Sequence, residues 1–150
     1  EEGAEPTAAS LRTRGYVAAL ESCGIPLQAA LCVGDVPWNR AGGQAAIESL
    51  ISDGVQFDAI VGFNDALALG ALTALHSAGM RVPEDVAVIG FDDIEESAYV
   101  VPALTTVDAG LPWVAERAVE LLCARLEGSE TGHAPAAEIA PWHLVVRDSA

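Results

Sequence analysis

Two adjacent carboxylates, Asp92 and Asp93, follow a short apolar run of the sequence. That run, Val86–Ile89, contains no polar residue, which predicts a strand covered on both faces, as in a parallel sheet. Gly90 then allows the backbone to turn. Ligands of open α/β sheets bind just beyond the carboxyl ends of strands, where a carboxylate accepts hydrogen bonds from hydroxyl or amine groups. The alternative is that one of the two aspartates caps a helical turn over Ile94–Ala98.

Asn64 and Asp65 stand in a similar place, after the strand predicted over Phe57–Gly62. A helix predicted over Asp65–Ala78 follows directly. Both residue types are good helix caps, and this role accounts for at least one of them. An amide both donates and accepts hydrogen bonds, so Asn64 also suits contact with a ligand. The residues alone leave open which of the two caps and which binds.

Arg12 lies in the first or second turn of a helix predicted over Pro6–Cys23. A βαβ arrangement places this end of the helix at the ligand edge of the sheet. The guanidinium group offers a rigid fork of donors that can span two neighbouring hydroxyls or a carboxylate. The alternative is a solvated arginine that pairs with an acidic side chain, as most arginines on helices do.

Trp38 lies in the loop of residues 35–40, after a short strand predicted over Ala30–Val33. An indole in a loop either covers part of the core or offers a flat face on which a sugar or a base can stack. Both roles are open for Trp38. Asn39 then caps a helix that is predicted to end near Asp53.

Predicted strands and helices alternate from residue 6 to residue 98, which indicates an α/β fold with a mainly parallel, doubly wound sheet and helices on both faces. The polar residues after the strands then share one edge of the sheet with Arg12. Small residues on the helix over Asp65–Ala78 allow a neighbouring element to approach closely. These small residues are Gly70, Ala71 and Ala74.

The last part of the chain contains one more helix and one more strand. The helix is predicted over Pro112–Leu126, because proline is favoured in a first helical turn and an apolar stripe follows it. A loop is predicted over Ser129–Ala137, and a final strand over His143–Val146. The stripe consists of Val114, Ala118, Leu121, Leu122 and Leu126.

Composition limits the function classes. The 150 residues are 51% hydrophobic but only 5% aromatic, which indicates one compact domain with a core of aliphatic side chains. Seven basic residues face 22 acidic ones, and the net charge of -15 repels phosphate backbones, so this chain alone should not bind nucleic acid.

The three cysteines lack metal-like spacing, which favours reduced thiols in a cytosolic protein. The best apolar run, Ala59–Leu75, is interrupted by Asn64 and Asp65, so a membrane span is not expected.

Three segments resemble the effector-binding domain of the LacI/GalR family of bacterial repressors. The first is VPEDVAVIGFDD, residues 82–93, which follows a helix that ends in a glycine. The second is Pro102–Val107, and the third is Leu144–Ser149. The order and spacing of these segments also match that family. The resemblance covers roughly residues 11–149.

The resemblance implies one lobe of a type I periplasmic-binding-protein-like clamshell. Residues 1–104 would form the C-terminal lobe, residues 105–141 a crossover and a helix of the other lobe, and residues 142–150 a terminal strand that returns to the first lobe. Most of the other lobe and the DNA-binding headpiece would lie upstream of this chain. The apolar stripe of the Pro112–Leu126 helix would then need another partner, either the chain's own sheet or a second copy of the chain.

The resemblance also assigns ligand contacts. It implies that Arg12, Asn64 and Asp92 bind the effector, that Trp38 is a stacking face, and that Asp65 is the helix cap. Such a wall suits sugars or nucleosides. The implied mechanism is allosteric and not catalytic, because the effector would favour one orientation of the two lobes. A cytoplasmic homodimer is implied, which would bind operator DNA only through the absent headpiece, and no cofactor or metal is expected.

Two other classes of protein stay open. A periplasmic sugar-binding receptor of a transporter shares the clamshell, but residues 82–93 and 102–106 favour the repressor. An enzyme that uses Asp92 and Asp93 as an acid-base pair or as metal ligands is the second alternative. It is disfavoured because the sequence has no Gly-rich phosphate loop, no paired nucleophile and base, and no metal-spaced histidines.

Overall fold

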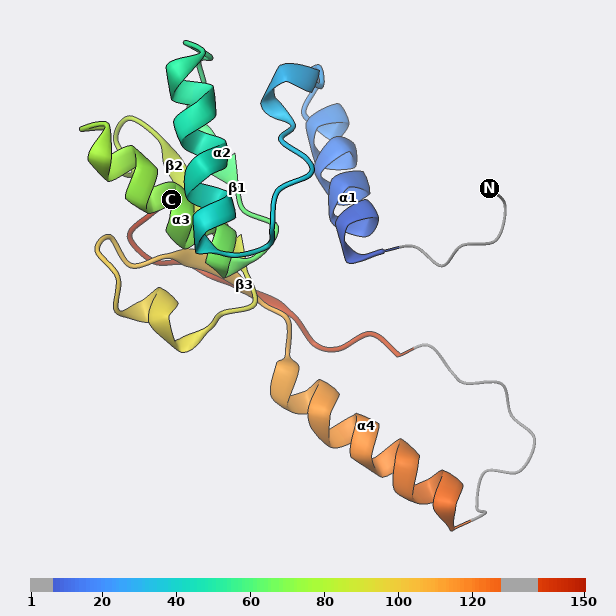
Figure 1. Ribbon diagram of the computed structural model, residues 1–150. Helices are drawn as coiled ribbons and strands as arrows, with labels where there is room; N and C mark the ends of the chain where they lie inside the picture. Colours follow the sequence, from blue (N-terminus) through green and yellow to red (C-terminus); the bar gives the residue numbers. More distant parts are fainter. Residues whose placement is uncertain (1–6, 128–137) are drawn as a thin grey trace.

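The computed structural model describes residues 7–127 and 138–150, so the loop predicted over Ser129–Ala137 lies outside the described residues. Residues 7–39 form helices and no strand, and helices and strands alternate from residue 40 onward (Figure 1). In chain order the elements are α1 (Ala8–Ser22), the 3-10 helix η1 (Ala29–Leu31), α2 (Arg40–Ser52), β1 (Ala59–Val61), α3 (Asp65–Ser77), β2 (Ala87–Phe91), the 3-10 helix η2 (Glu95–Ala98), β3 (Thr105–Asp108), α4 (Leu111–Leu126) and β4 (His143–Val145).

The four strands form one mixed sheet in the order β1-β2-β3-β4. The first three strands are parallel, and β4 is antiparallel to β3, so the predicted mainly parallel sheet is confirmed. Ile89 pairs with Thr105, and Phe91 with Val107. The carboxyl ends of β1, β2 and β3 therefore lie along one edge of the sheet, where the candidate site residues were expected.

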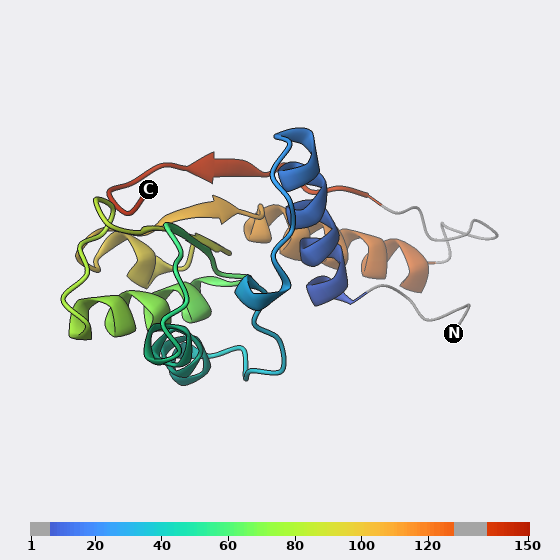
Figure 2. The ribbon, with the colours of Figure 1, turned by 90° about the horizontal axis from the view of Figure 1, so that it is seen from above.

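The core lies between the sheet and α3, and α2 packs on α3 (Figure 2). Small residues permit this close packing, as the sequence predicted. A side-chain carbon at Gly70 would overlap the backbone carbonyl oxygen of Arg40 on α2. The buried apolar residues are Ile47, Ala68, Leu69, Ala71, Leu72, Ala74, Leu75, Val86, Val88 and Leu104.

The strand predicted over Ala30–Val33 does not form. The chain makes η1 there, with local hydrogen bonds from Leu31 N to Gln28 O (3.0 Å) and from Cys32 N to Ala29 O (3.1 Å). A strand satisfies its backbone groups through a neighbouring strand, and β1 pairs only with β2 in the described part of the chain. The short apolar run therefore takes local turns instead.

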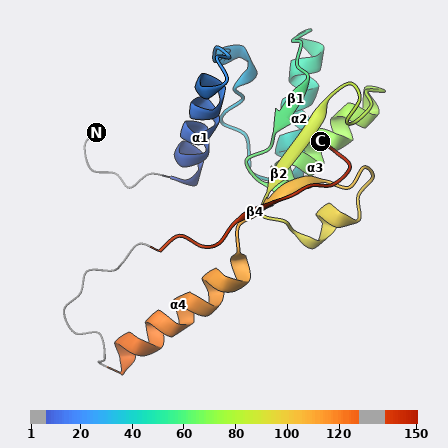
Figure 3. The same ribbon diagram turned by 180° about the vertical axis from the view of Figure 1, so that it is seen from behind.

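Helix α4 extends away from the sheet, as seen from both sides of the molecule (Figures 1 and 3). None of its residues is buried. Of the two partners considered for its apolar stripe, the chain's own sheet is therefore wrong, and a second copy of the chain stays a prediction. Leu122 and Leu126 of the stripe are 57% and 79% exposed, which leaves the stripe free for a partner outside this chain.

The C-terminal segment fastens the strands together. Val88 N donates a hydrogen bond to the backbone oxygen of Ser149 (2.7 Å), and the Ser149 hydroxyl donates to Val88 O (2.6 Å). The same hydroxyl oxygen accepts from Thr105 N (2.8 Å). Because Ser149 is fully buried between β2 and β3, the chain end is a structural part of the sheet that bears the candidate site.

Candidate functional site

Arg12 reaches from α1 to the end of β1. Thr7 caps α1 by accepting a hydrogen bond from Ser10 N (3.2 Å), which fixes the start of the helix one turn before Arg12. The Arg12 Nη1 donates to the backbone oxygen of Phe63 (2.6 Å). This bond brings a residue of the first helix to the sheet edge, as predicted, although α1 itself contributes no buried residue.

Two aromatic rings and one carboxylate surround the Arg12 guanidinium. Its central carbon lies 4.0 Å from the centre of the Phe91 ring and 5.5 Å from that of Trp38. Its Nη2 lies 3.8 Å from Oδ1 of Asp92. Stacking on aromatic faces is favourable for guanidinium groups. Arg12 is thus held on several sides, and its side chain is still 23% exposed, so donors remain available.

Asp92 occupies a special backbone conformation at the end of β2. Its φ is 120°, and that of Asp93 is 52°, both in the positive region that side chains rarely adopt. The Asp92 N–H donates to Val107 O on β3 (2.9 Å), which turns the carboxylate toward Arg12. Burial raises the pKa of the Asp92 carboxyl; Arg12 opposes this rise, and the nearby charge of Asp65 adds to it.

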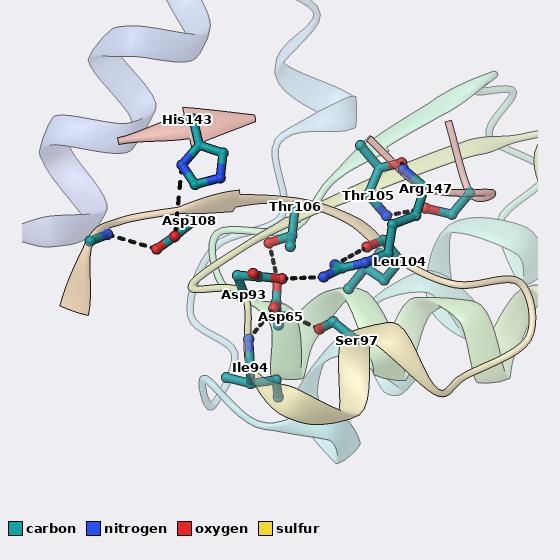
Figure 4. Close-up of polar contacts among 12 residues, drawn as sticks. Asp65, Asp93, Ile94, Ser97, Leu104, Thr105, Thr106, Asp108, His143 and Arg147 are labelled. Atoms are coloured by element: carbon teal, nitrogen blue, oxygen red, sulfur yellow. Dashed lines mark hydrogen bonds and ion pairs between the residues drawn. The ribbon is translucent and has the colours of Figure 1, made fainter. Parts of the chain in front are cut away.

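Asp93 contacts a different partner. Its Oδ1 accepts a hydrogen bond from Nη2 of Arg147 (2.7 Å), and Nη1 of Arg147 donates to Leu104 O (2.8 Å) (Figure 4). Asp92 and Asp93 therefore bind different arginines and do not form a pair of facing carboxylates. Neither caps the turn after them, because Ile94 holds the N-cap position of η2 without a side-chain bond.

Asn64 is the N-cap of α3: its Oδ1 accepts from Leu67 N (2.8 Å). The prediction that Asp65 caps this helix is wrong. Asp65 is instead fully buried and accepts hydrogen bonds from residues on other segments, because its position directly after the cap points it under the sheet. The Nδ2 of Asn64 lies 3.4 Å from Trp38 O, so the amide also stands at the sheet edge, where its contact with a ligand stays a prediction.

Trp38 lies in the loop before α2 and is 41% exposed. Its ring meets that of Phe63 edge-on, with 6.3 Å between the centroids. The indole therefore covers part of the site and still leaves surface free for stacking, so the two predicted roles are compatible. The four predicted residues Arg12, Trp38, Asn64 and Asp92 are brought together by these contacts.

Sequence reasoning missed the aromatic rings between these polar groups. Phe63 directly precedes Asn64 shortly after β1, and Phe91 directly precedes Asp92 at the end of β2, so the same aromatic-polar pair occurs near the carboxyl ends of both strands. That repetition was the available signal. An apolar hollow adjoins Phe91; it is lined by Phe91, Val107, Ala109, Ile139, Ala140 and Trp142.

Metal chemistry has no visible basis in the described ranges 7–127 and 138–150. No group of three or more His, Cys, Asp or Glu side chains there could hold a metal ion. Cys23, Cys32 and Cys123 are free and exposed. The site instead combines hydrogen-bond donors, acceptors and aromatic faces, which is the chemistry of small-molecule binding.

This sheet edge is a candidate small-molecule site of an α/β domain, and comparison with known proteins gives the family. The periplasmic binding protein-like domain family matches residues 2–150. The HTH-type transcriptional regulator AscG of Escherichia coli is 40% identical over 119 residues, which are 79% of this chain and 35% of AscG.

Solved structures agree with this match. A LacI-family transcriptional regulator from Sanguibacter keddieii has a TM-score of 0.89 and 40% identity, over 94% of this chain and 52% of that one. The complex of the regulator CelR with cellobiose has a TM-score of 0.87 and 31% identity, over 99% of this chain and 45% of that one.

The chain belongs to the periplasmic binding protein-like domain family, in the form found in LacI/GalR-type transcriptional regulators. The predicted fold class and family are thereby confirmed. The chain spans about a third of AscG and about half of the two solved regulators. In the described part of the chain, no helix is long and apolar enough to cross a membrane.

Proposed function

We propose that this chain forms one wall of the effector-binding cleft of a LacI/GalR-type transcriptional regulator. The observation that carries the proposal is the convergence of Arg12, Trp38, Asn64 and Asp92 at the carboxyl edge of one sheet. These residues come from four separate segments, and each keeps some exposed surface. Gathering polar groups from separate segments at one edge costs stability. A ligand-binding role explains why the fold gathers them there.

The chemistry of the wall favours a hydroxylated ring as ligand. Asp92 accepts hydrogen bonds, Arg12 donates them, and Trp38 offers a flat apolar face. A sugar or a nucleoside presents neighbouring hydroxyls beside an apolar ring face and satisfies all three. The CelR complex, which contains cellobiose, supports a sugar as the ligand class.

The regulator is preferred to a periplasmic sugar receptor because the relatives and structural neighbours reported above are transcriptional regulators. Such a protein works in the cytoplasm and acts by binding, without catalysis. The net charge of -15 argues against direct contact between this chain and the phosphate backbone, so in the proposed regulator operator DNA would be bound by another segment. The sequence of that gene product discriminates the two classes: a helix-turn-helix supports the regulator, and a signal peptide supports the receptor.

The exposed apolar residues support two further contacts of the regulator. We assign the stripe of α4 to a second lobe of the clamshell, since no residue of α4 is buried here. Of the crossover predicted over residues 105–141, Thr105–Asp108 instead form β3 of this sheet, so the crossing part would begin after β3. Tyr99 and Val101, 78% and 96% exposed beside η2, support a homodimer contact on the sheet-bearing lobe.

The test is ligand binding by the full-length gene product. Thermal shift and titration calorimetry with cellobiose, D-ribose, mannitol and adenosine should give a hit that is lost in Arg12→Ala and in Asp92→Ala. Arg14→Ala is the matched control, because Arg14 is an exposed arginine on the same helix. A hit that survives both site variants would overturn the assigned site, and no hit with any probe would count against a sugar-like effector.

A further inference from the structure

Asp65 is a buried carboxylate for which the proposed site gives no role. It is 0% exposed, and a buried charge is costly unless hydrogen bonds compensate it. Helix capping does not explain it, because Asn64 already caps α3. The Asp65 carboxylate must therefore have a role other than capping, because the fold retains it despite the free-energy cost of its burial.

Three donors from two other segments meet the Asp65 carboxylate. Its Oδ2 accepts from Ile94 N (3.0 Å) and from the Ser97 hydroxyl (2.7 Å), and its Oδ1 accepts a short hydrogen bond from the Thr106 hydroxyl (Figure 4). The contact is close on the strand side as well. A side-chain carbon at Gly90 would overlap Oδ1 of Asp65.

The contacts of Asp65 lie before and after Asp92 in the chain: a donor after it and a close packing contact before it. Ile94 follows Asp92 by two residues, and Gly90 precedes it by two. Thr106 directly precedes Val107, whose carbonyl oxygen accepts the N–H of Asp92 (2.9 Å). One carboxylate thus connects the strand before Asp92, the turn after it and the neighbouring strand that holds its backbone.

The backbone of Asp92 needs such support. Side chains at positive φ cost of order 1 kcal/mol or more and persist only where the surroundings determine them. Asp92 and Asp93 are two consecutive residues of this kind. Arg147 secures the side chain of Asp93, and Asp65 secures the backbone of the next residue by accepting the N–H of Ile94.

We propose that Asp65 is a positioning residue that holds the Asp92 turn in its ligand-binding conformation. The contacts of Asp65 alone support its role in holding this turn. Only the description of the turn as ligand-binding rests on the proposed function. Asp65 itself is buried and touches no ligand. It acts through the backbone at Ile94 and Val107, and so sets the direction in which the Asp92 carboxylate faces the cleft.

The experiment compares Asp65→Ala, Asp65→Asn and Ser149→Ala in the full-length gene product. Ser149 is the matched control, because it is also fully buried and hydrogen-bonded but contacts Val88 and Thr105. The first readout is amide hydrogen exchange, which needs no ligand. Asp65→Ala should speed exchange at Asp92 and Ile94 about tenfold or more and leave Thr105 unchanged, while Ser149→Ala should do the reverse.

The second readout is the affinity of the folded fraction for cellobiose and D-ribose. Asp65→Ala should weaken binding about tenfold or more, and Ser149→Ala should change it less than about twofold. Asp65→Asn should restore most of the affinity, since its oxygen can accept from Ile94 and Ser97 while its amide donates to Thr106.

Unchanged exchange at Asp92 and Ile94 in folded Asp65→Ala would overturn the positioning role, and so would equal loss of affinity in Asp65→Ala and Ser149→Ala. If Asp65→Ala does not fold, Ser97→Ala replaces it and should speed exchange at Ile94 and not at Thr105. If the wild-type protein binds no probe, the sugar-like effector of the proposed function is contradicted, and the exchange contrast still decides the role of Asp65.

Discussion

The guanidinium of Arg12 donates a hydrogen bond to the backbone oxygen of Phe63, with 2.6 Å between Nη1 and the oxygen. This bond joins the first helix to the end of β1, although the two residues are 51 positions apart. The other guanidinium nitrogen, Nη2, faces Asp92 at 3.8 Å. Arg12 therefore has two tasks: it docks α1 on the sheet, and it presents charged donors beside the principal acceptor of the site.

Replacement of Arg12 by lysine separates these tasks. Lys keeps the charge but lacks the planar fork that bonds Phe63 and stacks on Phe91. Arg12→Lys should lower the affinity for a sugar probe by about tenfold, as measured by calorimetry, and should also lower the Tm, because the bond to Phe63 that docks α1 is lost. Arg14→Lys should bind like the wild type. Equal affinities for the wild type and Arg12→Lys would mean that only the charge at this position matters.

Asp92→Asn should stabilise the free protein and abolish effector binding. The raised pKa of Asp92 means that the folded state disfavours its ionised form, so ionisation costs stability above that pKa and costs nothing below the ordinary value of 3.8. Urea unfolding should therefore show Asp92→Asn more stable than the wild type at about pH 7, with no difference near about pH 3. A less stable Asp92→Asn at neutral pH would contradict this account of the site.

The elements of the sheet could be predicted because their signals are local. The apolar run before Asp92 forms β2, and the predicted helix after Asn64, with its side of small residues, forms α3 beside its close neighbour α2. Capping, periodicity and glycine placement need no knowledge of distant contacts. For the same reason the sequence could place site residues at strand ends.

The errors arise where a distant partner decides the outcome. Ala30–Val33 has the composition of a strand, but β1 takes no second neighbour in the described part of the chain. Asp65 is a residue type that often caps helices, but hydrogen-bond donors up to 41 positions away determine its role. The partnership of Asp93 with Arg147 spans 54 positions and leaves no local trace. Such choices depend on tertiary contacts, which a single sequence does not reveal.

The Asp93–Arg147 pair should contribute measurably to stability. Their side chains are only partly exposed, and Arg147 also bonds Leu104 O (2.8 Å). A double-mutant cycle with Asp93→Asn and Arg147→Met should give a coupling energy of about 1–2 kcal/mol in urea unfolding. The exposed pair Arg81–Asp85 is the control and should couple more weakly, because solvent screens it. Equal coupling in both pairs would exclude a special role for Asp93.

Gly70→Ala tests the packing of α2 on α3. An added methyl group would overlap the carbonyl oxygen of Arg40, and both elements must move to admit it. Gly70→Ala should lower the free energy of unfolding by about 3 kcal/mol. Gly15→Ala is the matched control on α1, where no atom lies within 4 Å, and it should be neutral or stabilise by up to about 1 kcal/mol. Similar effects of the two changes would contradict the close contact.

The last prediction concerns the apolar stripe of α4. Leu122 and Leu126 are exposed, so Leu122→Glu and Leu126→Glu remove no buried contact and should change the free energy of unfolding of this chain by less than about 0.5 kcal/mol. Buried Leu75→Ala, the control, should cost about 2–5 kcal/mol. If the stripe binds a second copy of the chain, the wild-type chain should associate with rising concentration in sedimentation velocity, and the two glutamate variants should stay monomeric. A wild-type chain that sediments as a monomer at every concentration would count against association between copies, and would leave the second lobe of the clamshell as the partner of the stripe.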